Sequence, residues 1–148
     1  MPRPLLIIAV GLPGSGKSTY FERIGANPVS TDAIRQQLAD DATDQTINGA
    51  VYATVRFLAR MRVSVGRPVT YIDATNLTVK DRKQFIDWAR EWDCGIQAIY
   101  FDTPLEVCLE RNRNRARTVP EHVMEMMAAK LAPPNVTEGF ESVSVVTP

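Results

Sequence analysis

Residues 11–19 constrain this chain more than any other segment. They read GLPGSGKST and fit the pattern G-x-x-x-x-G-K-[ST], which is typical of a loop that holds phosphate groups. The apolar run 5–10 leads directly into the loop, as expected for a strand buried on both faces. Residues 17–24 behind it can begin a helix, whose positive end favours anions. This context disfavours a glycine-rich turn that binds nothing. We therefore predict a strand, a phosphate-binding loop and a helix in succession.

The positions of this loop have distinct chemical roles. Glycine permits backbone conformations in which successive N–H groups turn towards phosphate oxygens. Lys17 is placed to reach the β- and γ-phosphates of a nucleoside triphosphate, and the Ser18 hydroxyl is placed to bind Mg²⁺. The predicted nucleotide-binding residues of the loop are Gly14, Ser15, Gly16, Lys17, Ser18 and Thr19.

Length and charge limit the class of protein. We expect one domain, residues 1–148, because a chain of 148 residues can bury a single core. The composition is 45% hydrophobic and 23% charged, as in ordinary globular proteins. Seventeen basic side chains balance seventeen acidic ones, so no global positive field indicates binding to long duplex nucleic acid.

The two cysteines and the apolar segments bear on the compartment. Cys94 and Cys108 form no C-x-x-C pattern, so we predict neither zinc nor disulfides and expect both thiols to be reduced core residues. No signal peptide is visible, and no apolar run is long enough to cross a membrane. We therefore expect a cytoplasmic protein without a membrane partner, and the oligomeric state is left open.

Strand and helix patterns alternate along the chain. Strands are predicted at 5–10, 28–31, 69–73, 96–101 and 143–146, and the helical patterns between them are typical of βαβ units with a parallel sheet. One long helix is predicted to bury the face made by Ile47, Val51, Val55, Leu58, Arg62 and Val65. Capping patterns predict further helix starts at Thr78 with Asp81, at Thr103 before Pro104, and at Pro120, the last helix ending by residues 133–134.

Polar residues follow four of the predicted strands. The phosphate loop, Asp32, Asp73 and Asp102 each come where a strand ends. In an open parallel sheet, ligands bind beyond the carboxyl ends of the strands. The sequence therefore predicts that these distant segments meet at one cleft.

Asp32 and Arg35 lie three residues apart after the second strand. A phosphoryl-transfer enzyme needs a carboxylate that orients and deprotonates the attacking hydroxyl, and Asp32 can serve. Arg35, one helical turn on, can bind a phosphate already present on the acceptor. In the alternative interpretation Asp32 only caps the helix and Arg35 is solvated, and the spacing does not decide between the two.

Asp73 ends the third predicted strand, where phosphotransferases of this loop type place an acid that holds Mg²⁺ directly or through water. Thr75 and Asn76 follow, as in a turn. The alternative is an aspartate that caps this turn through its own backbone.

Four arginines lie between residues 111 and 117, at the end of a predicted helix: Arg111, Arg113, Arg115 and Arg117. One or two cations at a helix C-terminus are favourable without any function. Four in a polar stretch indicate a lid, about residues 111–119, that closes over a triphosphate and supplies positive charge. The spacing does not say which arginine contacts ATP.

Taken together, these motifs resemble the 5′-polynucleotide kinases, the P-loop phosphotransferases of phage and bacterial nucleic-acid end repair, and their broader kinase relatives. The motifs are the phosphate loop, Asp32-x-x-Arg35, Asp73-Ala74-Thr75-Asn76-Leu77, and Arg111-Asn112-x-x-Arg115 before a Val-Pro helix start. The similarity runs over nearly the whole chain, from residue 5 to about residue 131. The loop alone is unspecific, and the three other motifs carry the resemblance.

The resemblance implies a fold and a set of roles. The fold is an α/β three-layer sandwich of the P-loop kinase type, with a mainly parallel sheet of about five strands, helices on both faces and an arginine-rich lid. By this resemblance, Lys17 binds phosphate and Ser18 binds Mg²⁺. Asp32 resembles the general base that acts on a 5′-hydroxyl. Arg35 resembles the arginine that binds the first phosphate of the acceptor. Arg115 resembles the lid arginine on the ATP phosphates; Arg111 is less well matched, and Asp73 lies near the metal.

Three functions follow as hypotheses. The first is an ATP- and Mg²⁺-dependent kinase that phosphorylates the 5′-hydroxyl ends of RNA or DNA. The second is a kinase of a small-molecule hydroxyl in a sugar, nucleoside or antibiotic, which the balanced charge favours. The third is a nucleotide-dependent switch or binding module. This hypothesis does not explain the Asp32-x-x-Arg35 motif.

Overall fold

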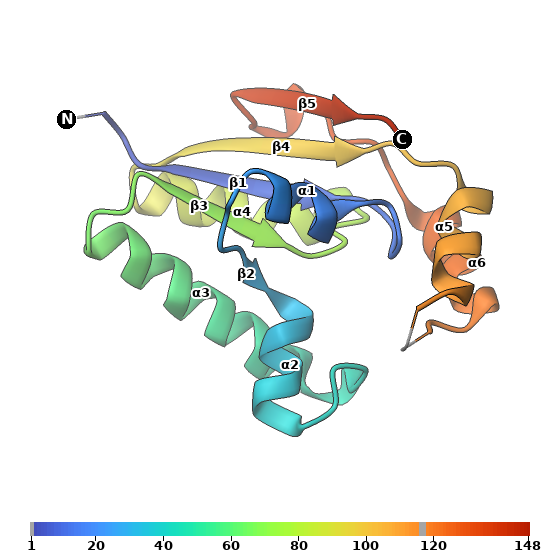
Figure 1. Ribbon diagram of the computed structural model, residues 1–148. Helices are drawn as coiled ribbons and strands as arrows, with labels where there is room; N and C mark the ends of the chain where they lie inside the picture. Colours follow the sequence, from blue (N-terminus) through green and yellow to red (C-terminus); the bar gives the residue numbers. More distant parts are fainter. Residues whose placement is uncertain (1, 116–117) are drawn as a thin grey trace.

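The computed structural model describes residues 2–115 and 118–148, and these contain a five-stranded parallel sheet in the order β2-β3-β1-β4-β5 (Figure 1). The strands are β1 (Leu5–Val10), β2 (Val29–Ser30), β3 (Val69–Asp73), β4 (Gly95–Phe101) and β5 (Ser142–Val146). The α-helices are α1 (Lys17–Arg23), α2 (Thr31–Ala39), α3 (Asn48–Ser64), α4 (Val79–Glu91), α5 (Leu105–Arg113) and α6 (Glu121–Lys130), with 3₁₀ turns η1 (Gln45–Ile47) and η2 (Val136–Glu138).

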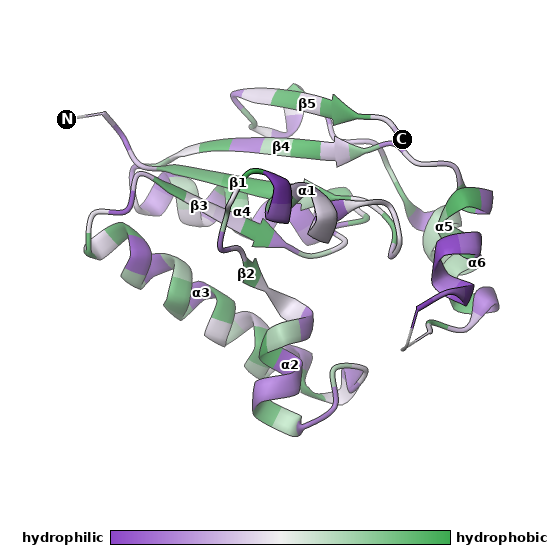
Figure 2. Ribbon diagram, viewed as in Figure 1, coloured by the Kyte–Doolittle hydropathy of each residue, from purple (hydrophilic) through white to green (hydrophobic). Residues whose placement is uncertain are grey.

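Alternate residues of β1 enter two different cores. Leu6 and Ile8 pack with residues of α3 and α4 on one face of the sheet, whereas Ile7 packs with Phe21 of α1 on the other. This alternation explains why the segment is apolar throughout, as Figure 2 shows. The three-layer α/β fold predicted from the sequence is confirmed, and the sheet is parallel in every pairing.

A third, smaller core joins the phosphate loop to α5 and α6. Leu12 of the loop and Leu77 of the β3–α4 turn pack against Cys108 of α5 and Met124 of α6. Cys108 is fully buried and, like Cys94, is a free cysteine. The two helices that flank the arginine-rich segment are therefore attached by apolar contacts to the loop that the segment faces.

The buried face of α3 differs from the prediction. Val51, Val55 and Ala59 are fully buried, whereas the predicted Leu58 and Val65 are 40% and 70% exposed. Residues four apart on the helix face the sheet, and the small Ala59 lets the helix approach it closely. Arg62 donates from Nη2 to the carbonyl of Val69 at 2.9 Å.

The helix starts are confirmed at two of the three predicted places. Thr78 caps α4 in a reciprocal capping box with Asp81, and α6 begins directly after Pro120. The prediction for Thr103 was wrong, because α5 begins at Leu105 behind Pro104 without any side-chain cap. Among the described residues, no helix combines the length and apolar character needed to cross a membrane.

Candidate active site

The phosphate loop takes the conformation that its glycines allow. Gly14 and Gly16 have φ angles of 79° and 102°, which residues with a β-carbon rarely adopt. A β-carbon at Gly14 would lie 3.0 Å from the carbonyl oxygen of Cys108. Thr103, instead of capping α5, donates its hydroxyl to the Ser15 carbonyl at 2.9 Å. The loop is thus fixed from α5 and from the segment that follows β4.

Lys17 is nearly buried beneath this loop. Its Nζ donates to the carbonyl oxygens of Gly11 and Leu12, at 2.8 Å each. Burial lowers the pKa of Lys17 to about 8, although the negative charges of Asp73 and Asp32 oppose the change. Desolvation of an ammonium group is relieved when an anion binds beside it, so the position favours phosphate.

The Ser15 hydroxyl is a second polar group that suits a phosphate ligand. Its Oγ is buried and has no hydrogen-bond partner within the described part of the chain. An unsatisfied buried hydroxyl costs free energy, and a phosphate oxygen above the loop can accept its hydrogen. The loop residues therefore fit a nucleotide triphosphate.

Asp73 and Ser18 come together at the end of β3. Burial raises the pKa of Asp73, and the Lys17 charge opposes that rise. The Ser18 side chain also lies close enough to the Asp73 carboxylate to lower the pKa of that group. One hydroxyl and one carboxylate beside bound phosphates are the donor set that Mg²⁺ takes in such sites, so these residues fit the ion.

The structure distinguishes Asp32 from the residue that caps α2. Ser30 is the N-cap, and its Oγ accepts a hydrogen bond from the Ala33 amide at 3.2 Å. The Asp32 side chain is 59% exposed and accepts a hydrogen bond from Nη1 of Arg35 at 3.1 Å. Asp32 therefore does not cap the helix, and its carboxylate is accessible to an acceptor.

Arg35 is buried, contrary to the alternative in which it is solvated. Its side chain is 7% exposed. Nε and Nη2 both donate to Oδ1 of Asn48, at 3.2 and 2.8 Å. A guanidinium held from two helices keeps a fixed direction, which is what recognition of an anion requires.

The arginine-rich segment divides into residues with different partners. Arg111 donates from Nη1 to the Gly14 carbonyl of the phosphate loop at 3.1 Å, and the charge of Arg115 acts on Lys17. Arg113 instead pairs with Glu121 of α6 at 2.7 Å. Arg117, the fourth arginine of the predicted lid, lies outside the described residues, as does residue 116. The end of α5 is hydrophilic (Figure 2).

The Asn112 side chain connects α5 to Val119, on the other side of the arginine-rich segment. Its amide nitrogen donates to the Val119 carbonyl at 2.6 Å, and its Oδ1 accepts from the Val119 amide at 2.9 Å. The side chain is almost fully buried. These two bonds hold Asn112 of α5 beside Val119, the residue before Pro120.

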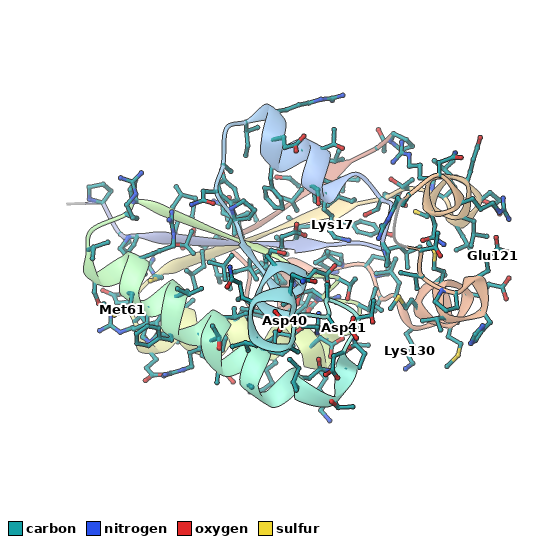
Figure 3. All side chains as sticks on the ribbon, turned by 60° about the horizontal axis from the view of Figure 1, so that its bottom comes forward. Lys17, Asp40, Asp41, Met61, Glu121 and Lys130 are labelled. Carbon is teal, nitrogen blue, oxygen red and sulfur yellow. The ribbon has the colours of Figure 1, made fainter. Side chains whose placement is uncertain are left out.

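One cavity of about 1190 Å³ joins these groups. Lys17 stands at the start of α1, between α2 on one side and the α5–α6 pair on the other (Figure 3). Of the residues predicted from the sequence, the cavity lining includes Gly14, Ser15, Gly16, Lys17, Ser18, Thr19, Asp32, Arg35, Asp73, Arg111 and Arg115. The prediction that distant segments meet at one cleft is confirmed for the phosphate loop, Asp32 and Asp73, whereas Asp102, at the end of β4, is exposed and does not line the cavity.

Several residues that line or support this cleft belong to none of the predicted motifs. Asn48 holds Arg35, and Tyr52, one turn further along α3, lines the cavity. Arg82 is fully buried and binds the carbonyls of Asn76 and Leu77. Its partners lie far from it in the sequence or are backbone atoms, so no local pattern indicates its role.

The fold and the site define a P-loop kinase. The chain belongs to the AAA_33 family, described as an AAA domain, which matches residues 6–134. Membership implies that the chain binds a nucleotide.

Two curated relatives align with almost the whole chain. The bifunctional polynucleotide phosphatase/kinase of Schizosaccharomyces pombe is 27% identical over 150 residues, which are 95% of this chain and 33% of that protein. The L-seryl-tRNA(Sec) kinase of Methanococcus maripaludis is 26% identical over 93% of this chain and 56% of that protein. The chain thus spans between one third and somewhat more than half of their lengths.

Solved structures share the fold. A chain of the Pnkp1/Rnl/Hen1 RNA repair complex superposes with a TM-score of 0.73 at 27% identity, covering 88% of this chain and 45% of that one. A putative kinase from Chloroflexus aurantiacus superposes with a TM-score of 0.76 at 17% identity, covering 99% of this chain and 86% of that one. At 17% identity, the similarity to the Chloroflexus aurantiacus protein shows a shared fold and no more.

Proposed function

We propose that this P-loop kinase transfers the γ-phosphate of ATP, with Mg²⁺, to the 5′-hydroxyl end of RNA or DNA. The observation that carries the proposal is the Asp32–Arg35 pair, joined at 3.1 Å and lining the same cavity as the phosphate loop. A carboxylate and a guanidinium side by side suit an acceptor in which a hydroxyl and a phosphate are neighbours. A 5′-terminal nucleotide has both groups.

The reaction is an in-line displacement at the γ-phosphorus. The acceptor oxygen forms the new P–O bond as the bond to the β-phosphate bridging oxygen breaks, and Asp32 accepts the hydroxyl proton. Lys17 and Arg115 stabilise the charge on the transferred group. Mg²⁺ held by Ser18 and Asp73 would neutralise charge on the phosphates.

The lid belongs to the same proposal. Residues 1–148 act as one kinase domain, in which segment 111–119 closes over the triphosphate and excludes water. Arg111 already contacts the Gly14 carbonyl, and Asn112 fixes both ends of the segment. We expect the Arg111 guanidinium to leave that carbonyl for a phosphate oxygen when the triphosphate binds.

The relatives support a hydroxyl acceptor on a nucleic acid. One is a polynucleotide phosphatase/kinase, and a solved neighbour comes from an RNA repair complex. The seryl-tRNA(Sec) kinases point to a related acceptor, a seryl hydroxyl attached to tRNA. In both names the acceptor is a nucleic acid or a group attached to one.

A small-molecule hydroxyl is the second candidate acceptor, and a charge observation favours it. Exposed or half-exposed carboxylates of Asp40, Asp41 and Asp44 flank Ala42 and Thr43, which line the cavity. Negative charge beside the acceptor opening opposes a long polyanion. With a net charge of zero, the chain has no general attraction for nucleic acid.

Transfer from γ-labelled ATP to a panel of acceptors tests the proposal. The panel contains 5′-hydroxyl oligonucleotides of RNA and DNA, single-stranded and duplex, beside nucleosides and sugars. We expect label on the 5′ ends, with Arg35→Ala reducing transfer to phosphate-bearing acceptors more than to simple alcohols. Label on sugars or nucleosides alone would support the second candidate. Slow hydrolysis that no acceptor stimulates would indicate a nucleotide-dependent switch.

A further inference from the structure

Asn48 makes the most specific contact to the acceptor side of the cavity. It is the first residue of α3, and its Oδ1 accepts hydrogen bonds from both Nε and Nη2 of Arg35. These bonds occupy one edge of the guanidinium, while Nη1 donates to Asp32. Of the five N–H hydrogens of arginine, the described contacts use three, and one on each terminal nitrogen is left for a ligand.

The side chain of Asn48 is uncharged, and this matters as much as its position. An asparagine oxygen fixes the guanidinium without neutralising it, whereas an aspartate in the same place would form an ion pair. Asp32 is the only carboxylate that the described contacts bring to Arg35. Arg35 is therefore paired with one carboxylate and one neutral amide oxygen, and this leaves more positive charge for an anionic acceptor than two carboxylates would leave.

The element that carries Asn48 is firmly packed. Val51 and Val55 of α3 are fully buried against the sheet, and Gln45 accepts a hydrogen bond from Nδ2 of Asn48 at 3.3 Å. The Tyr52 ring, one turn along the same helix, lines the cavity and lies against Phe85 with ring centroids 6.4 Å apart. The position of Asn48 is thus fixed by the buried face of α3 and by a hydrogen bond to the turn before it.

We infer that Asn48 is a positioning residue that sets the preference of Arg35 for acceptors with a phosphate beside the reacting hydroxyl. The inference rests on the proposed function, and it narrows the acceptor to hydroxyls that neighbour a phosphate monoester or diester. Asn48 acts through Arg35 and touches no reacting atom.

Two substitutions separate position from charge. Asn48→Ala removes both bonds, and Asn48→Asp keeps an oxygen in place but adds a negative charge. The acceptors compared are a nucleoside 3′-monophosphate and the matching nucleoside. We expect each variant to raise the KM of the phosphorylated acceptor about tenfold or more, since a hydrogen bond to a charged group has about that effect. The kcat and the KM of ATP stay near their original values.

A double-mutant cycle distinguishes positioning from a general structural effect. In an Arg35→Ala background, Asn48→Ala has no further effect on selectivity, because the group it positions is gone. Thr54→Ala, on the same helix with its hydroxyl bonded to the Ala50 carbonyl, is the matched control and leaves selectivity unchanged. Additive losses in the cycle, or wild-type selectivity in both Asn48 variants, would overturn the inference.

Calorimetric binding of a nucleoside 3′-monophosphate without ATP gives a readout that does not require transfer. Weaker binding in Asn48→Ala and Asn48→Asp supports the inference even if no oligonucleotide gains label, a result that would refute only the proposed function. Equal binding by the two variants and the original protein would refute the inference whatever the transfer assay shows.

Discussion

The two sides of the cavity that we assign to the phosphate donor and to the acceptor are built in different ways. On the donor side, Lys17 and the groups that hold it belong to one continuous segment, and its ammonium bonds to carbonyls five and six residues away. On the acceptor side, Arg35 from α2 depends on Asn48 from α3, thirteen residues further along the chain. Lys17 is buried, whereas the Asp32 side chain is 59% exposed.

This difference shows where specificity can change. The loop accepts few substitutions, because Gly14 and Gly16 have positive φ angles and Lys17 is bonded to two carbonyls of its own segment. A site assembled from two helices and a connecting turn can change its acceptor through the turn or through α3 without disturbing the nucleotide. We therefore expect substitutions on the two sides to affect different kinetic constants.

Asp32→Asn tests the acceptor side with the largest expected effect on rate. The amide cannot accept the hydroxyl proton, so we expect kcat to fall by about 10²–10⁴ while the affinity for ATP is unchanged. Single-turnover transfer and ATP titration measure the two quantities. Asp93→Asn, at an exposed turn, serves as the control. A parallel loss of ATP affinity would move Asp32 to the donor side.

Glu138→Ala tests the scaffold beneath the donor side. Glu138 pairs through both oxygens with the fully buried Arg82, at 2.8 and 2.9 Å. Removing it leaves a buried charge uncompensated, so we expect a loss of about 3–5 kcal/mol in the free energy of unfolding. Urea denaturation measures this change in the free energy of unfolding. The exposed Lys83–Asp87 pair is the control, and Asp87→Ala should cost at most about 1 kcal/mol.

Asn112→Ala tests the lid, which links the two sides. Loss of both bonds to Val119 should lower the free energy of unfolding by about 1–3 kcal/mol. We expect kcat to fall about tenfold, which corresponds to 1.4 kcal/mol in the barrier, because Arg111 and Arg115 lose their fixed position. A fall in stability with unchanged kcat would show that the segment is no lid.

The pH dependence of ATP binding gives the smallest effect. The pKa of Lys17 is about 8 in the folded protein, so its charge is lost as the pH rises through that value. We expect the Kd of ATP to rise about fourfold between pH 7 and 8.5, measured by calorimetry. A constant Kd over this range would contradict the assignment.

The unfolding equilibrium provides an independent check on the same group. The unfolded chain retains the Lys17 proton up to about pH 10.5, whereas the folded chain releases it near pH 8. Because the unfolded state then binds more protons, the contribution of Lys17 to the stability of the nucleotide-free protein rises between these values. Lys17→Met should abolish that rise.

Sequence patterns were sufficient for the donor side and the sheet. The run before the loop, the loop and the Thr78 capping box are local features, and each forms as predicted. The strand-end rule also brought Asp32 and Asp73 to one cleft, because parallel strands end at the same edge.

The remaining features depend on contacts between distant segments. Thr103 fits a cap by local pattern, but its hydroxyl bonds to Ser15, a contact that only the folded sheet creates. The same holds for the partners of Asn48 and Arg82, and for the exposure of Leu58 on α3. Tertiary packing decides such positions, and periodicity alone does not.

The central claim is that one cavity holds the triphosphate and the acceptor hydroxyl in line, with Asp32 at the hydroxyl and Arg35 at the neighbouring phosphate. A crystal structure with a non-hydrolysable ATP analogue, Mg²⁺ and a 5′-hydroxyl dinucleotide tests it most directly. The account predicts the 5′ oxygen within hydrogen-bond distance of the Asp32 carboxylate and the adjacent phosphate on the Arg35 guanidinium. A 5′ oxygen outside this cavity, or one directed away from Asp32, would contradict it.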